Sequence, residues 1–408
     1  MRNKSLLMLL LVVAVPLSIY SQAKQKKYVV KVVNSSNHDK TDNPVVISLN
    51  DIKCDFKIKS AVVLKGNQEI VSQLDDLNQD AKYDELAFVT DMAANSKENF
   101  TVLFSSEKST KVYKARTFAE MMAYNGKGKL AYITSFSAKG DENVYSFTHH
   151  HGPAFESELV AYRVYFNEKQ TIDPYGKFNK GLEINATKFY PTDEQLKAGY
   201  GDDVLRVNNS CGIGAFKGWD GSNATHIQPV IEREERIISS GPVRSIAQAK
   251  VIGWEYKGNE YNMINRYTLY AGHRDIVIDV IFDEKLGNVN FSSGVQKLKE
   301  NSSMFSDHKG LVGSWGTDFP VNDTIKYAKE TVGIGTFIPK QICGKEHADK
   351  ENYLYEISAP GKSSLRYYTT FTSKKESFGF KDDKEWYDYL KIWKSELETP
   401  CTVEVKAL

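Results

Sequence analysis

The sequence is poor in the side chains that build metal centres. Among its 408 residues there are four cysteines and eight histidines. The cysteines lie far apart, at Cys54, Cys211, Cys343 and Cys401, and show no metal-ligand spacing. They allow three disulfide pairings, among which the sequence does not choose.

An excess of one charge and long internal apolar runs are also absent. The chain has 53 basic and 52 acidic residues, so nothing favours a nucleic-acid or membrane-surface partner. Beyond the N-terminus no segment is long and apolar enough to cross a bilayer. We therefore expect no nucleic-acid partner and no membrane insertion, and the sequence leaves the oligomeric state open.

Several familiar catalytic and ligand-binding motifs are missing too. There is no Gly-x-Ser-x-Gly elbow and no His-Glu-x-x-His helix, which argues against serine hydrolases and zincins. The glycines of Cys211–Phe216 lack a Walker lysine and a dinucleotide fingerprint. The segment Asp76–Glu85 begins like a calcium loop, but Ala81 replaces the turn glycine and Ala87 the bidentate glutamate. An acidic turn without metal is the favoured interpretation.

The N-terminus has the pattern of a secretory signal peptide. Arg2 and Lys4 precede a short apolar run from Leu6 to Ile19, and a small residue follows before the expected cleavage site. No cysteine follows closely, so a lipid anchor is not expected. We assign residues 1–21 to the signal peptide and expect a periplasmic or secreted protein.

Alternating short segments predict an all-β fold. The clearest runs, 245–254, 262–270 and 276–282, are joined by tight turns and predict an antiparallel meander. Further strands are expected at 28–33, 45–48, 61–64 and 86–89. Helices are expected at 117–124, 192–198 and 382–397, the last with Trp386, Leu390 and Trp393 on one buried face. Sparse helices without βαβ alternation predict a large antiparallel β-sandwich.

A polar stretch at 105–111 is the best candidate for a domain boundary. Before it we expect a small N-terminal β-domain, residues 22–110. After it we expect a large β-sandwich that carries the chemistry, residues 111–408.

The main candidate for chemistry is the run His149-His150-His151, which leads through Gly152-Pro153 into a strand carrying Arg163 and Tyr165. Histidine changes charge near neutral pH and suits proton transfer. A histidine loop with a purely structural role would fit the same residues. Because adjacent strand residues point to opposite faces, at most two of the three easily share a metal. We expect no cofactor, and a divalent cation at this triplet stays open.

Four segments together resemble a known family: 72–86, Gly152–Phe166, the Ile-Asp-Pro-Tyr-Gly-Lys turn at 172–177, and Ser-Gly-Pro-Val-Arg at 240–244. They are similar to exported bacterial proteins from polysaccharide-utilisation loci, formerly a domain of unknown function, that include ulvan oligosaccharide dehydratases. The resemblance covers nearly the whole mature chain. It implies a galactose-mutarotase-like β-supersandwich and an oligosaccharide substrate.

The chemistry that this resemblance implies is β-elimination on a terminal uronic acid. Arg163 is expected to balance the uronate carboxylate. His151, Tyr165 or Tyr175 is expected to remove the C5 proton, and His226 to protonate the departing C4 oxygen. The remaining expected substrate-binding residues are His150, Lys177 and Trp219.

The identity of the reaction stays open at this point. Loss of water would make the protein a dehydratase, and loss of a sugar a polysaccharide lyase. A glycoside hydrolase would need a carboxylate pair, for which Glu156, Glu158, Asp173 and Asp220 are candidates. The same sequence would also suit a mutarotase-like epimerase or a non-catalytic glycan-binding protein.

Overall fold

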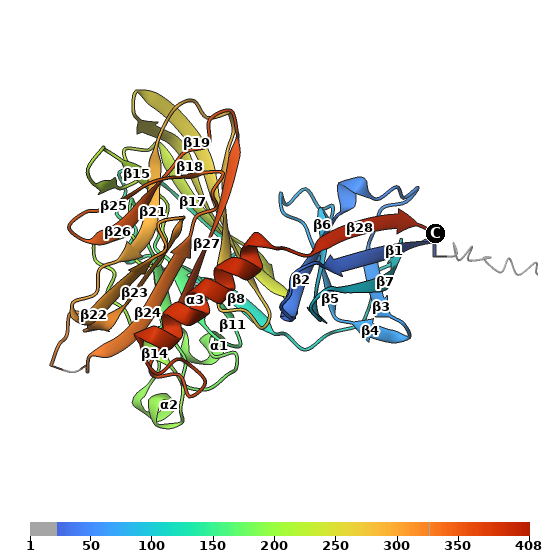
Figure 1. The fold of residues 1–408 in the computed structure, drawn as a ribbon, viewed down its shortest axis with the longest axis horizontal. Coiled ribbons are helices and arrows are strands. Elements are labelled where there is room, and N and C mark those ends of the chain that lie inside the picture. The colour runs from blue at the N-terminus through green and yellow to red at the C-terminus, as the bar shows by residue number, and fades with distance from the viewer. Residues whose placement is uncertain (1–22, 326) are drawn as a thin grey trace, which may run out of the picture.

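The computed structural model describes residues 23–325 and 327–408, so the expected signal peptide lies outside the described residues. Antiparallel strands dominate, in a small domain and a large one (Figure 1). The expected all-β fold is confirmed, with a large antiparallel sandwich, a small N-terminal β-domain and few helices.

The small domain consists of two sheets that enclose their own core. One sheet has the order β28 (Thr402–Ala407), β1 (Gln25–Asn34), β7 (Ser96–Ser105), β3 (Ser60–Lys65) and β4 (Gln68–Ile70). The other has β2 (Lys40–Ser48), followed by a turn of 3-10 helix at Leu49–Asp51, then β6 (Glu85–Met92) and β5 (Ser72–Asp75) in the order β2-β6-β5. Alternate residues of β1 and β7 are buried in this core. The strands expected here are present.

The C-terminal strand β28 pairs with β1, so the last residues of the chain complete the small domain. This differs from the expected boundary, which gave residues 111–408 to the large domain. Lys40 of β2 strengthens the return, because its Nζ donates to the carbonyls of Glu396 and Thr399, at 2.8 and 2.6 Å. A polar stretch in the sequence can indicate the end of a domain. It does not indicate that a strand distant in sequence, such as β28, pairs with that domain.

The large domain is built on a nine-stranded sheet. Its order is β10 (Ser135–Lys139), β17 (Glu232–Ser240), β18 (Arg244–Tyr256), β19 (Asn259–Tyr270), β20 (Asp275–Phe282), β27 (Ser364–Ser373), β24 (Glu330–Phe337), β23 (Leu311–Asp318) and β22 (Glu300–Ser306). The neighbours β18, β19 and β20 form the predicted meander.

Two smaller sheets share one hydrophobic core with the nine-stranded sheet. The first has the order β14 (Asp202–Asp203), β13 (Ile172–Gly176), β12 (Ala161–Val164), β11 (Thr148–Ser157), β8 (Thr117–Tyr124) and β9 (Leu130–Tyr132). The second has β16 (Ala224–Thr225), β15 (Lys217–Trp219), β21 (Phe291–Gln296), β26 (Asn352–Ile357) and β25 (Cys343–Ala348). Single bridges at Gly212 and Ile213 connect them.

Two of the three expected helices are confirmed. They are α2 (Asp193–Lys197) and α3 (Asp383–Glu398), and a short α1 (Ile184–Thr187) precedes α2. The predicted face of α3 packs Trp386, Leu390 and Trp393 against the nine-stranded sheet (Figure 1). The expected helix at 117–124 is wrong, because this segment is strand β8. Its Met, Ala and Glu residues favour a helix locally, but pairing with both β9 and β11 outweighs that preference.

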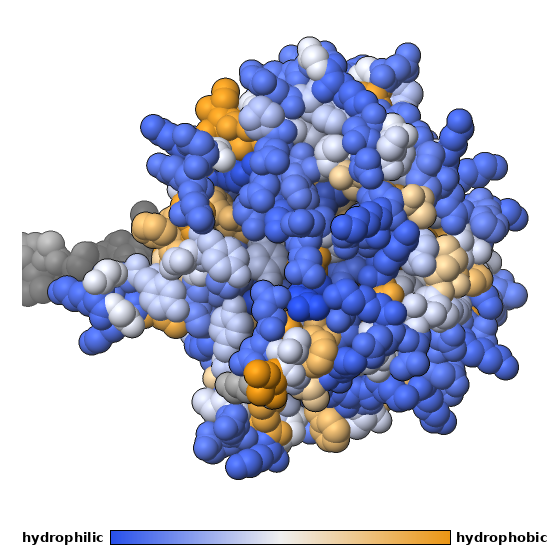
Figure 2. Space-filling model, turned by 90° about the vertical axis from the view of Figure 1, so that its left-hand side faces the viewer, coloured by the Kyte–Doolittle hydropathy of each residue, from blue (hydrophilic) through white to orange (hydrophobic). Residues whose placement is uncertain are grey.

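Ion pairs hold the two domains together. Arg244 of β18 donates to Asp75 of β5 at 2.7 Å and to Glu85 of β6 at 2.7 Å. Arg116, in the connection between the domains, binds Asp42 through two nitrogens, at 2.7 and 2.8 Å. The face of the molecule in Figure 2 is largely hydrophilic, with its hydrophobic residues in small separate groups.

Candidate active site

A β-bulge in β11 sets the positions of the three histidines. The register between β11 and β8 shifts between His149 and Ala154, and His150 and His151 have φ angles of 62° and 63°. Gly152 follows with a φ of 153°, and a Cβ there would lie 1.9 Å from the carbonyl oxygen of Val164. Only glycine fits this close approach, which explains why the histidine run ends in Gly152.

The bulge sends the three imidazoles to three different partners. His149 Nε2 donates to the carbonyl of Lys188 at 2.9 Å. His150 is buried, with its Nε2 3.1 Å from a carboxylate oxygen of Glu120. His151 Nδ1 donates to the carbonyl of Tyr145 at 2.9 Å. Across residues 23–325 and 327–408, no group of three or more Cys, His, Asp or Glu side chains is arranged to hold a metal ion.

The hydrogen bond of His151 determines which ring nitrogen is free. A backbone carbonyl only accepts, so Nδ1 carries the proton, and in the neutral imidazole the lone pair is on Nε2. The ring stacks on Tyr145 at 3.7 Å between centroids and lies parallel to Tyr165 at 5.9 Å. Burial, opposed by the Tyr145 hydrogen bond and helped by the charge of Arg163, lowers the pKa of His151 below its ordinary value. His151 is therefore a neutral, oriented base at pH 7.

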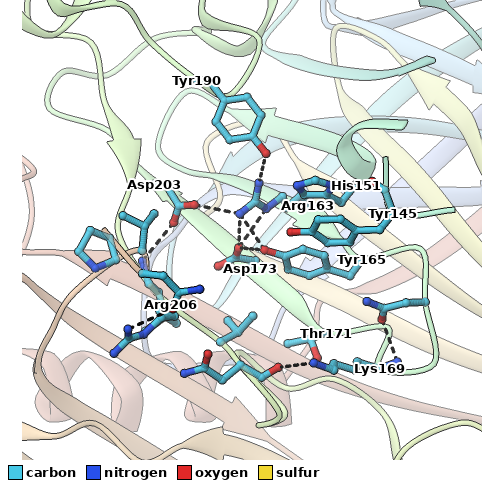
Figure 3. A pocket seen from close by; sticks show the side chains of 17 residues that line it. Tyr145, His151, Arg163, Tyr165, Lys169, Thr171, Asp173, Tyr190, Asp203 and Arg206 are labelled. Atoms are coloured by element: carbon cyan, nitrogen blue, oxygen red, sulfur yellow. Dashed lines mark hydrogen bonds and ion pairs between the residues drawn. The ribbon is translucent and has the colours of Figure 1, made fainter. Parts of the chain in front are cut away.

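His151 borders a cavity of about 500 Å³ between the six-stranded sheet and the loop that carries Pro320–Asn322 (Figure 3). Arg163 of β12 and Asp173 of β13 line it. Its lining side chains that can carry charge or donate protons are Tyr145, His151, Arg163, Tyr165, Lys169, Asp173, Tyr190, Asp203 and Arg206.

Arg163 lines the cavity, and all three nitrogens of its guanidinium donate to protein groups (Figure 3). Its Nη2 donates to Asp173 at 2.6 Å and to Asp203 at 2.9 Å. Its Nη1 donates to Tyr190 Oη at 2.7 Å, and Nη2 also reaches Tyr165 Oη at 2.8 Å. Arg163 was expected to hold a substrate carboxylate. The structure instead commits its guanidinium to two carboxylates and two phenols.

The two aspartates share this one cation. Burial and the charge of Asp173 raise the pKa of Asp203 well above its usual range, against the opposing effect of Arg163. Burial also raises the pKa of Asp173, but Arg163 and Tyr165 oppose the shift. Two carboxylates that bind one nitrogen repel each other, so one of them binds a proton more readily than the other. Asp203 is the carboxyl that we expect to be protonated, because its pKa is raised well above the usual range.

The phenols of Tyr165 and Tyr190 differ in what they do with their protons. Tyr165 Oη donates to Asp173 at 2.9 Å. Tyr190 Oη accepts from Arg163, and in the described part of the chain its own proton has no acceptor. Burial raises the pKa of both phenols, so both are protonated at neutral pH. Tyr190 is thus a proton donor at the edge of the cavity.

Two further cationic side chains, Arg206 and Lys169, line the cavity. Arg206 Nη2 is 3.5 Å from Asp318 and Nη1 is 3.3 Å from the side-chain oxygen of Asn322, which are long contacts. Lys169 Nζ contacts the carbonyl of Asn208 at 3.2 Å. Both cations retain capacity to bind an anion in the cavity.

The structure brings three of the eight expected site residues, His151, Arg163 and Tyr165, to this cavity. The other five do not line it. His150 is buried beside Glu120, and Tyr175 is buried against Phe189, at 5.2 Å between ring centroids. Lys177 forms a fully buried ion pair with Glu156 at 2.6 Å.

The last two expected residues belong to other surroundings. Trp219 packs on His347, at 4.6 Å between ring centroids, and lines a separate surface hollow. His226 lies near Lys217 and Glu168, and burial together with the charge of Lys217 lowers its pKa to about 4. His226 therefore lies outside this cavity, and its expected role as the acid of this site is wrong.

The sequence did not point to five residues of the site: Tyr145, Lys169, Tyr190, Asp203 and Arg206. Tyr190 and Arg206 lie in irregular segments after α1 and β14, where no periodic pattern marks them. The contribution of Tyr145 to His151 includes its backbone carbonyl, which no side-chain motif can reveal. Asp173 was noted, but only as one of several carboxylates.

Comparison with known proteins identifies a family. A family model described as a domain of unknown function (DUF4861) matches residues 32–403. The chain belongs to the DUF4861 family. Among curated proteins nothing matches.

Two solved structures from Enterococcus faecalis are similar to this DUF4861 chain. One is described as a protein in glycosyl hydrolase family 38, with 10% identity and a TM-score of 0.47, and the match covers 93% of this chain and 47% of the other. The second is an α-mannosidase from strain V583, with 10% identity and a TM-score of 0.45, covering 93% and 46%. The chain thus spans about half the length of these structures.

The candidate site of this DUF4861 protein combines an oriented neutral base, a protonated phenol and two incompletely paired cations around one cavity. That set suits moving a proton from carbon to a departing oxygen on an anionic substrate.

Among the described residues no helix combines the length and the apolar character that a membrane span requires.

Proposed function

We propose that the protein is a carbohydrate-active carbon–oxygen lyase, a dehydratase that removes water from a non-reducing-end uronic acid and leaves a 4,5-unsaturated uronate. The observation that carries this proposal is the tautomer of His151. Its Nδ1–H is held by the Tyr145 carbonyl, so Nε2 presents a lone pair beside the cavity. Removal of a proton from carbon needs such a base in a fixed orientation.

The C5 proton of a uronate becomes removable when the negative charge that develops on its carboxylate is balanced. Most donors of Arg163 bind protein groups, so we assign this role to Arg206 and to Lys169, which lies in the turn between β12 and β13. Both cations carry only long contacts to neighbouring groups. Arg163 then acts through Tyr190, whose oxygen it binds at 2.7 Å.

Each proton and electron pair in the reaction has a place to go. His151 Nε2 takes the C5 proton, and the electron pair of the C5–H bond forms the C4–C5 double bond. The C4–O bond breaks, and Tyr190 gives its proton to the departing hydroxide, which leaves as water. Arg163 stabilises the resulting phenolate until the proton on His151 returns to it through solvent.

The oligosaccharide substrate and the exported location rest on the sequence. The resemblance of segments 72–86, 152–166, 172–177 and 240–244 favours a uronate-terminated, ulvan-type oligosaccharide. The N-terminal pattern of residues 1–21 favours a periplasmic or secreted enzyme. If the group on C4 is a sugar, the same residues perform polysaccharide lysis.

Hydrolysis is disfavoured by the placement of the carboxylates. A glycoside hydrolase needs two carboxyl groups on opposite sides of the scissile bond, about 5 Å or more apart. Asp173 and Asp203 instead bind the same nitrogen of Arg163. Of the other three candidate carboxylates, Glu156 is paired with buried Lys177 and Glu158 binds Arg116. Asp220 accepts from the backbone of Ser222 and Asn223 and does not line the cavity.

The test is incubation of the purified mature protein with oligosaccharides that end in saturated glucuronic acid. New ultraviolet absorbance of an unsaturated uronate, with loss of one water and unchanged chain length by mass spectrometry, supports the dehydratase. New absorbance with shorter chains would identify a lyase. Binding without any new product would contradict elimination and indicate a glycan-binding protein.

A further inference from the structure

Exposed aromatic side chains gather beside the candidate active site. In the described structure seven large aromatic side chains are exposed, and five of them lie in one region: Tyr124, Tyr132, Tyr145, Phe147 and Tyr190, with exposed fractions of 45, 59, 48, 57 and 43%. A concentration of exposed rings next to a cavity is typical of a ligand-binding surface. Only Tyr145 and Tyr190 belong to the cavity itself.

The rings form a row that leads away from the cavity, with Lys188 between His149 and Tyr132. Tyr190 at its rim contacts His149, with 5.3 Å between ring centroids. His149 contacts Tyr124 at 6.2 Å, and Tyr124 Oη lies 3.4 Å from His149 Nδ1. Beyond them, the ammonium of Lys188 lies over the ring of Tyr132 at 4.8 Å.

Strand register places the row on one face of the sheet. Met122 of β8 is directly opposite His149 of β11 on one side and Tyr132 of β9 on the other. Opposed residues point to the same face, and Tyr124, two residues after Met122, shares it. Because adjacent strands are about 4.8 Å apart, the row from β11 to β9 extends roughly 10 Å. We call Tyr124, Tyr132 and His149 the aromatic platform.

The platform has the polar edges that a sugar requires. The hydroxyls of Tyr124 and Tyr132 stand at the rim of their rings, and Tyr132 Oη donates to the side-chain oxygen of Asn185 at 3.2 Å. The ammonium of Lys188 covers one face of Tyr132, but 59% of this side chain is exposed. The remaining apolar ring surface and the hydroxyl rims suit the C–H faces and the hydroxyl groups of pyranoses.

We propose that the aromatic platform binds the sugar units that follow the terminal uronate, so that the protein acts on oligosaccharides in preference to short fragments. This rests on the proposed function for the identity of the reacting end. The occupant is the reducing-side part of the same chain, because the platform is continuous with the cavity through Tyr190 and His149.

The experiment compares Tyr124→Ala and Tyr132→Ala on a saturated glucuronate-terminated disaccharide and on a tetrasaccharide of the same linkage. The matched control is Tyr83→Ala, since Tyr83 is 40% exposed in the small domain. Loss of one stacking contact is expected to lower kcat/KM for the tetrasaccharide by roughly two- to tenfold, through KM. The disaccharide, with one unit beyond the uronate, should be affected less than the tetrasaccharide, and the control should be unaffected. Equal effects on both lengths, or none, would overturn the platform.

Calorimetric binding separates this proposal from the proposed reaction. Suppose that no unsaturated product forms, but that the wild-type protein binds the tetrasaccharide more tightly than the disaccharide and Tyr132→Ala removes this difference. The proposal of a sugar-binding platform is then supported, and the proposed elimination is rejected. If the tetrasaccharide binds no more tightly than the disaccharide, the platform is rejected whatever the reaction.

Discussion

Replacement of Arg163 by methionine distinguishes a cation that binds substrate from one that holds the site together. Arg163 is 3% exposed and binds Asp173 and Asp203 through one nitrogen, at 2.6 and 2.9 Å. Removal of one partner from a buried ion pair leaves an uncompensated charge and costs about 3–5 kcal/mol. We expect Arg163→Met to lower the free energy of unfolding by about this amount at pH 7.

The loss should depend on pH in a defined direction. Without the guanidinium, the pKa values of Asp173 and Asp203 in the folded protein rise further above the unfolded value of about 3.9. A carboxyl whose pKa is raised by folding destabilises the protein as pH rises above the unfolded pKa, and it has no such effect below that value. The variant should therefore be closest to wild type near pH 4.

Urea unfolding at pH 7 and at pH 4 measures both effects, with Arg366→Met as the control. Arg366 also binds a carboxylate through two nitrogens, at 2.7 and 3.0 Å from Asp279, but its side chain is 58% exposed. Its loss should cost no more than about 1 kcal/mol. If Arg163→Met were as stable as this control while losing substrate affinity, Arg163 would be a free substrate-binding group and our interpretation of the site would be refuted.

Three further predictions concern the histidine region. His151→Ala should lower kcat/KM by ~10²–10⁴-fold with the fold intact by circular dichroism, and the acid limb of the wild-type pH profile should lie below the ordinary imidazole pKa, because burial lowers it. A limb at or above pH 7 would contradict His151 as the base. His226→Gln should leave turnover at pH 7 nearly unchanged. It should also reduce the loss of thermal stability as pH falls from about 6.5 towards 4, since folding lowers the pKa of His226 to about 4. Gly152→Ala should lower both the melting temperature and turnover, because its Cβ would lie 1.9 Å from the Val164 carbonyl and displace the bulge; a variant with wild-type melting temperature and turnover would contradict this.

Local pattern was sufficient for most of the architecture. The alternating runs of β18, β19 and β20 and the tryptophan face of α3 follow from periodicity, because each element buries one face. Strand β8 was misread since its composition suits a helix, and only pairing with β9 and β11 makes it a strand. The return of β28 to β1 was invisible for the same reason, because contacts between distant segments leave no local trace.

The amino-acid sequence was enough to predict that the fold is all-β, that the chain has the residues for proton transfer, and that His151, Arg163 and Tyr165 belong to one region. These three lie on or directly beside the hairpin of β11 and β12, strands close in sequence whose antiparallel pairing brings them together. Their roles depend on the packed sheets. Packing placed Asp203 and Tyr190 on Arg163, excluded His226 and Tyr175 from the cavity, and fixed the tautomer of His151 through a backbone carbonyl. Burial and the sharing of charge between groups far apart in the chain set a side chain's chemistry, and both exist only once the sheets have packed together.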